Sequence, residues 1–156
     1  MKIRTSGMLL VVAAMFFSSC HSRILYEKTI SVPQEGWNQE KFLAYTIPVE
    51  DTVNQYQISL LIRNDARYDY SNLFLFINTT APGGEGIRDT VEIRMSDEKG
   101  NWIGKGIGSK YTLEIPFKTH VQFPQSGPYI LEIEQGMRAE YLQHITDVGI
   151  RITNLK

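Results

Sequence analysis

The sequence contains one cysteine, three histidines and two tryptophans among 156 residues, and it has no excess of positive charge. A single thiol cannot form an internal disulfide, so the fold does not depend on cystine cross-links. The 16 basic side chains are matched by 17 acidic ones, whereas nucleic-acid binding needs a surplus of Lys and Arg on one surface. We therefore expect no nucleic-acid partner, and a chain of this length can form a sufficient core as one domain.

The one long apolar run lies near the N-terminus and is too short to span a bilayer. Lys2 and Arg4 precede ten consecutive apolar residues, 8–17, which is the pattern of a signal peptide. The run ends in Phe17-Ser18-Ser19-Cys20, which resembles the lipobox of bacterial lipoproteins, where the cysteine is acylated and becomes the new N-terminus. Several acyl chains anchor a protein stably, since each buried methylene contributes about 0.8 kcal/mol. We therefore predict that Cys20 is lipidated and that the membrane is a partner through this lipid.

Cleavage before Cys20 divides the chain into three parts. Residues 1–19 are the predicted signal peptide, 20–24 a lipidated tether and 25–156 a single β-sandwich domain. The mature chain keeps 14 basic and 17 acidic side chains, and the first acid after the cysteine is Glu27. In the sorting rules of bacterial lipoproteins, acids close behind the cysteine favour inner-membrane retention or surface export. By resemblance to those rules, we expect the protein on the periplasmic face of the outer membrane.

The mature chain alternates apolar and polar residues nearly throughout. In residues 55–63 the apolar side chains are Tyr56, Ile58, Leu60 and Ile62, which is typical of a half-buried strand. Strands are also predicted in segments with the same alternation or many β-branched and aromatic residues, namely 24–32, 42–49, 90–96, 111–115, 129–133 and 148–152. Residues 73–77 are apolar on both faces and suit a central strand.

The predicted fold is all-β, an antiparallel two-sheet β-sandwich of jelly-roll or Ig-like type with at most one short helix. The only helical spacing is in Met137–Ile145, where Met137, Tyr141, Leu142 and Ile145 share one side. Proline cannot donate to a sheet ladder, so we expect all six prolines at or near strand ends, Pro116 among them.

Catalytic motifs are missing from the sequence. The histidines His21, His120 and His144 are far apart and lack the H-x-x-x-H spacing of metal ligands. No G-x-S-x-G motif follows a predicted strand, and lipidation would consume the only thiol. In the glycine-rich segment 104–110, Lys105 is followed by Gly rather than the Ser or Thr of a phosphate-binding loop. We expect a protein that is not an enzyme and has neither a cofactor nor a metal.

Two kinds of binding site stay open. The segment between two strong strands, 63–70, combines Arg, Asp, Asn and Tyr, and Arg and Tyr are enriched at protein interfaces; the alternative is a plain polar hairpin loop. With the turn region 100–108 it forms a candidate surface for other envelope proteins, made of Arg63, Arg67, Tyr68, Tyr70, Trp102 and Lys105. The rival is a glycan-binding sandwich that stacks sugars on Trp37, Trp102, Tyr68 or Tyr70.

Two short motifs predict a covalent modification. Asp51-Thr52-Val53 and Asp89-Thr90-Val91 match an Asp, then Ser or Thr, then an apolar residue. This pattern resembles the periplasmic O-glycosylation signal of Bacteroides. Thr52 and Thr90 are therefore predicted O-glycosylation sites.

Several blocks of the mature chain together resemble a known family. They are Arg63-Asn64, Asn72–Ile77, Pro82-Gly83-Gly84, Asp89–Glu92, Asp97–Gly106, Gly127-Pro128-Tyr129 and Asp147–Arg151. With the lipobox and the total length, they resemble the GldH family of gliding-motility lipoproteins of Bacteroidetes. The resemblance implies a membrane-anchored, non-catalytic scaffold or accessory subunit of a gliding-motility or secretion-related envelope assembly. It brings no catalytic residues.

Overall fold

The structure, a computed structural model, describes residues 23–155. Cys20 and the predicted signal peptide lie outside the described residues. Within them the chain forms eleven β-strands and no helix, and every strand pairing is antiparallel. The all-β prediction is confirmed.

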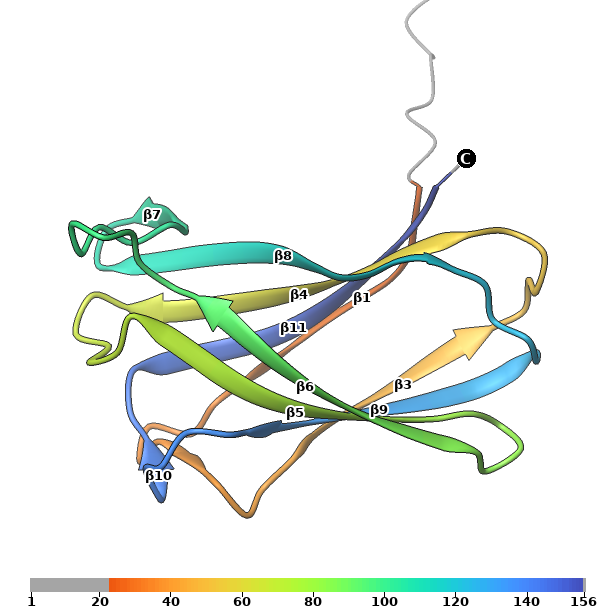
Figure 1. Cartoon of the computed structure of the whole chain (residues 1–156), viewed down its shortest axis with the longest axis horizontal. Helices are drawn as coiled ribbons and strands as arrows, with labels where there is room; N and C mark the ends of the chain where they lie inside the picture. Colours follow the sequence, from red (N-terminus) through yellow and green to blue (C-terminus); the bar gives the residue numbers. More distant parts are fainter. Residues whose placement is uncertain (1–22, 156) are drawn as a thin grey trace, which may run out of the picture.

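Two sheets pack against each other as a sandwich (Figure 1). The five-stranded sheet has the order β1-β11-β4-β8-β7, and the four-stranded sheet has the order β3-β9-β5-β6. The first comprises β1 (Ile24–Ser31), β11 (Ile145–Asn154), β4 (Tyr56–Asp65), β8 (Lys110–Val121) and β7 (Lys105–Ile107). The second comprises β3 (Leu43–Val49), β9 (Gly127–Gln135), β5 (Asn72–Thr80) and β6 (Gly86–Arg94). A two-stranded pair, β2 (Trp37–Asn38) with β10 (Tyr141–Leu142), lies beside them.

The core lies between the sheets and is made by the alternation seen in the sequence. Every second residue of a strand points inward, because successive side chains of a strand face opposite sides. The inward residues of β4, β5, β9 and β11 are almost wholly buried, namely Ile58, Leu60, Ile62, Leu73, Leu75, Ile77, Leu131, Ile133, Val148, Ile150 and Ile152. The segment 73–77 is central, as predicted, because β5 lies between β9 and β6.

The one segment with helical spacing, Met137–Ile145, forms a turn followed by β10. The buried side chain of Gln135 stabilises this turn, since its amide donates to the Ala139 carbonyl at 2.7 Å and accepts from the Met137 N–H at 2.8 Å. Leu142 is buried in the sandwich core. These bonds replace the hydrogen bonds that a helix would have made here.

Pro116 does not lie near a strand end as predicted, since it is in the middle of β8. β7 pairs only with residues 110–112 of β8, so the ladder is open beside Pro116. The register to β4 shifts close by, between Ile58 and Ser59. An edge with a bulge is where a sheet tolerates proline.

Different segments of the chain form the two ends of the sandwich (Figure 1). At the terminal end, which consists of residues 23–25, 50–55 and 155, β1 begins and β11 finishes. At the distal end are the β4–β5 loop, residues 65–71, and the segment around β7, residues 97–109. Within residues 23–155 no helix has the length and hydropathy needed to cross a bilayer.

Candidate interaction surface

The distal end brings together the two segments that the sequence proposed as a binding surface. The Ala66 N–H donates to the Ser109 carbonyl at 2.8 Å, which joins the β4–β5 loop to the β7–β8 turn. The rings of Tyr68 and Trp102 are 6.2 Å apart between their centroids. The two segments therefore form one continuous surface although residues 72–96 separate them in the sequence.

The aromatic side chains at this end form a cluster that is partly inside the fold. Tyr68 is only 4% exposed, and its hydroxyl donates to the Asn72 carbonyl at 2.9 Å. Burial raises the pKa of its phenol. Tyr70 meets this ring edge-on at 5.6 Å, and Trp102 also contacts Tyr111 at 6.1 Å. Tyr68 thus holds the loops together and is not available as a surface contact, whereas Tyr70 is exposed.

These rings do not form a flat platform for a sugar. The planes in the cluster are inclined to one another by 62°, 46° and 43° along the series Tyr70, Tyr68, Trp102 and Tyr111. Trp37, the other tryptophan proposed for stacking, is buried in the core, and its indole N–H donates to the Lys41 carbonyl at 3.0 Å. Of the four proposed stacking rings, Tyr68 and Trp37 are therefore inaccessible.

Asp65 fixes the shape of the β4–β5 loop. Its carboxylate accepts from the Arg67 backbone N–H at 2.7 Å and from the Arg67 guanidinium at 2.6 Å. His144 Nδ1 lies 3.5 Å from the same carboxylate. The guanidinium and the backbone donor hold the pKa of Asp65 well below its usual range. Arg67 itself is 75% exposed, so an ordered loop presents a cation to solvent.

Exposed apolar residues lie in the other segment of the distal end, around β7. Ile107, at the end of β7, is 88% exposed, and Ile103 is 47% exposed. Exposed Lys105 stands between them in the sequence. Sequence reasoning missed both isoleucines, although two apolar residues in a segment otherwise made of Gly, Lys and Ser were a visible signal. Large exposed aliphatic side chains on the same end of a domain as exposed Arg and Tyr are typical of a protein-binding surface.

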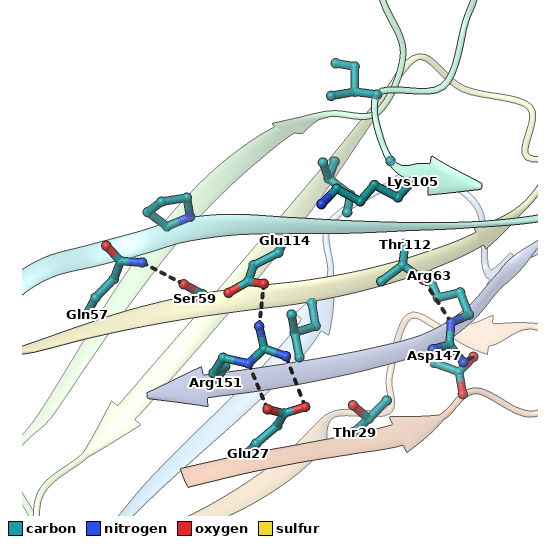
Figure 2. Close-up of a pocket in the computed structure, with 15 residues that line it drawn as sticks. Glu27, Thr29, Gln57, Ser59, Arg63, Lys105, Thr112, Glu114, Asp147 and Arg151 are labelled. Atoms are coloured by element: carbon teal, nitrogen blue, oxygen red, sulfur yellow. Dashed lines mark hydrogen bonds and ion pairs between the residues drawn. The ribbon is translucent and has the colours of Figure 1, made fainter. Parts of the chain in front are cut away.

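A groove of about 640 Å³ runs over the outer face of the five-stranded sheet and adjoins the distal end (Figure 2). The strand register brings the side chains of the groove together, because residues that face outward at paired positions of adjacent strands lie side by side. Arg151 of β11, for example, is paired with Glu27 of β1 and with Ser59 of β4. Arg151 of β11 lies between Glu27 of β1 and Glu114 of β8, with nitrogen to oxygen distances of 2.7 and 2.5 Å. The hydrogen bond from Arg151 lowers the pKa of Glu27.

The other end of the groove carries two of the three basic residues that the sequence analysis proposed for the binding surface. Arg63 Nε donates to the Thr112 hydroxyl at 3.2 Å, and Arg63 Nη1 pairs with Asp147 at 3.4 Å. Lys105 lines the groove on the side of β7 (Figure 2). The three acidic side chains that line the groove, Glu27, Glu114 and Asp147, are thus each paired with an arginine.

The remaining predicted residues lie apart from this surface. Thr90 is exposed on the outer face of edge strand β6. Thr52 is half-buried in the β3–β4 turn, and its carbonyl accepts from the Gln122 amide at 2.8 Å. His120, near the end of β8, has a positive φ of 55°. In the described part of the chain, no three His, Cys, Asp or Glu side chains gather in a way that could hold a metal ion.

Comparison with known proteins decides the family. The model of the GldH lipoprotein family matches residues 24–152, which is the whole sandwich from β1 into β11. The chain belongs to the GldH lipoprotein family. The resemblance predicted from the sequence blocks is therefore confirmed.

Two relatives match this GldH family chain over nearly its full length. The gliding motility lipoprotein GldH homolog of Christiangramia forsetii is 32% identical over 97% of this chain and 97% of its own. The gliding motility lipoprotein GldH of Flavobacterium johnsoniae is 31% identical over 97% of this chain and 98% of its own. Among solved structures, CBM28, a carbohydrate-binding module specific for non-crystalline cellulose, matches with a TM-score of 0.44 at 10% identity, covering 82% of this chain and 70% of the module.

Proposed function

We propose that this GldH family lipoprotein is a non-catalytic accessory subunit that binds another protein of a gliding-motility or secretion-related envelope assembly. Its lipid, on Cys20, holds it on the periplasmic face of the outer membrane. The partner binds the distal end through Arg67, Tyr70 and Ile107, with the groove beside Arg63 and Lys105 as a continuation of the same surface.

One observation carries this proposal. The loop 65–71 and the segment around β7 meet at the end of the sandwich opposite to where β1 begins. Ile107 is 88% exposed there. Such a side chain contributes hydrophobic free energy only when another surface covers it and removes it from water. The position favours a partner that reaches the domain from the side away from the anchor.

Crosslinking of native envelopes followed by recovery of the lipoprotein tests the proposal. We expect defined envelope or secretion proteins to co-purify, and their yield to fall with Arg67→Ala, Tyr70→Ala and Ile107→Ser. The matched control is Ile87→Ser, because Ile87 is also a 63% exposed isoleucine but lies beside the β5–β6 turn. Equal loss with the control would contradict the assignment of the surface.

A different result would replace the function. If no protein partner is recovered, and the protein binds a glycan array in a way that Trp102→Ala abolishes, the domain is a carbohydrate-binding module and not a scaffold.

A further inference from the structure

Four exposed apolar side chains gather at the terminal end of the sandwich. Val53 is 79% exposed, and Ile24, Leu25 and Leu155 are 43%, 40% and 37% exposed. Two backbone hydrogen bonds hold these segments together. The Asn154 N–H donates to the Arg23 carbonyl at 2.7 Å, and the Leu155 N–H donates to the Gln55 carbonyl at 2.9 Å.

Hydrogen bonds fix the turn that carries Val53, so the exposure of the Val53 side chain is set by the fold. The Asp51 carboxylate accepts from the backbone N–H of Val53 at 2.7 Å and of Asn54 at 3.1 Å, as in an Asx-turn. These hydrogen bonds lower the pKa of Asp51. The Gln122 side chain holds the same turn through its bond to the Thr52 carbonyl at 2.8 Å. Val53 is thereby directed outward from the domain.

The short tether between Cys20 and Ile24 limits how far the terminal end can lie from the membrane. Cys20 precedes Ile24 by four residues, and four residues span at most about 14 Å even when fully extended. The headgroup layer of a bilayer is about half as deep, because headgroups add roughly 5–8 Å to each side of the hydrocarbon core. An acyl anchor on Cys20 therefore keeps the beginning of β1 within reach of the membrane surface.

We propose that the terminal end lies directly against the bilayer that holds the anchor, with Val53, Leu155, Ile24 and Leu25 inserted among the lipid headgroups. This inference rests on the proposed lipidation of Cys20. Apolar side chains gain free energy at the acyl boundary in proportion to the area they bury, and they add to the anchoring of the lipid. The contact fixes the orientation of the sandwich, so that the distal end points away from the membrane.

Site-specific fluorescence tests the contact on the full mature lipoprotein, purified from membranes and reconstituted in phosphatidylethanolamine and phosphatidylglycerol vesicles. Cys20 is the only cysteine, and lipidation blocks its thiol, so Val53→Cys and Ile107→Cys each introduce one position for a polarity-sensitive dye. Ile107 is a matched control because it is 88% exposed at the distal end. Spin-labelled lipid in the vesicles and iodide in the buffer serve as the two quenchers.

We expect the dye at residue 53 to shift to the blue and lose its intensity to spin-labelled lipid, whereas the dye at residue 107 is quenched by iodide alone. Equal behaviour of the two dyes, both quenched by iodide, would overturn the membrane contact. Labelling of the wild-type chain distinguishes a missing membrane contact from a missing lipid anchor. If the wild-type chain reacts with the dye, the Cys20 thiol is free, and both the lipidation of Cys20 and the membrane contact are overturned.

Discussion

Lys118 of β8 and Asp89 of β6 form an ion pair between the two sheets, with Nζ and Oδ2 2.6 Å apart. The two strands lie in different sheets and do not pair with each other. The carboxylate oxygen is inaccessible to solvent, and the ammonium is the cation that compensates it. Lys118 points inward because the register to β4 is irregular there and places it opposite buried Ile58. The pair thus closes the side of the sandwich along β6 and β8.

Removing the cation of this pair should destabilise the fold. Lys118→Met leaves the partly buried Asp89 carboxylate, whose side chain is 29% exposed, without its cation. We expect a loss of about 1 kcal/mol in the free energy of unfolding. The double variant Lys118→Met with Asp89→Asn should recover part of that loss, since it leaves no uncompensated charge. Urea denaturation measures both. Glu98→Gln is the control, because Glu98 pairs with Arg94 while 90% exposed, and it should leave the midpoint unchanged. A control effect as large as that of Lys118→Met would contradict the argument.

Gly149 is the position in the five-stranded sheet where a larger side chain should be most costly. A Cβ there would lie 2.6 Å from Thr29 Oγ1 and 3.0 Å from the Lys28 carbonyl oxygen. Thr29 can change rotamer, but the backbone of β1 cannot withdraw without straining its pairing with β11. We expect Gly149→Ala to cost about 1–3 kcal/mol in thermal or urea unfolding. Gly86→Ala is the matched control, because a Cβ there finds no atom closer than 3.8 Å.

The fold could be predicted from the alternation of apolar and polar residues, because a strand that is buried on one face has an apolar residue at every second position. Tyr56, Ile58, Leu60 and Ile62 are all buried inside β4 as expected. Local pattern could not reveal which strands are neighbours. The grouping of Glu27, Arg151 and Glu114 depends on β11 lying between β1 and β4, and such pairing joins residues up to 124 positions apart.

Which side chains of the candidate surface are exposed could be predicted only in part, for a different physical reason. Arg67 and Tyr70, which loop composition proposed for the surface, are exposed. The same composition could not separate Tyr68 from Tyr70, because burial of a loop ring depends on whether it folds back onto the core. Tyr68 does so, since its hydroxyl finds the Asn72 carbonyl four residues on. A loop aromatic with a local acceptor is thus a structural residue here.

Acid should weaken the outer face of the five-stranded sheet through Glu27. Its pKa is lowered from 4.5 by Arg151, so its contribution to stability is complete above 4.5 and is lost as the pH falls through the lowered value. Glu27→Gln should therefore be less stable than the wild type at pH 7, and the difference should shrink progressively below pH 4.5. Urea midpoints at a series of pH values measure it. The exposed Glu40→Gln should follow the wild type throughout, and a constant difference for Glu27→Gln would refute the linkage.

O-glycosylation, if it follows folding, should favour Thr90 over Thr52. Thr90 is exposed on an edge strand, whereas Thr52 is half-buried in a turn held by Asp51 and Gln122. Thr52 also lies at the terminal end, where a glycan would keep Val53 from the membrane. We expect intact-peptide mass spectrometry of the native protein to show a glycan on Thr90 that disappears in Thr90→Ala. Two bare threonines would remove the prediction.

Lipidation of Cys20 is the prediction on which the placement of the protein depends. Acylation needs the thiol, so Cys20→Ala should abolish it and leave the protein as a soluble or unprocessed form. The sandwich begins only at Ile24, so the substitution should not alter the fold, and the variant should unfold at the same urea concentration as the wild type. His21→Ala is the matched control, since it keeps the lipobox intact and should stay in the membrane fraction. Cell fractionation with detection of the mature size distinguishes the two. If Cys20→Ala still sediments with the membrane at its processed size, the lipid is not the anchor, and another surface of the domain holds it there.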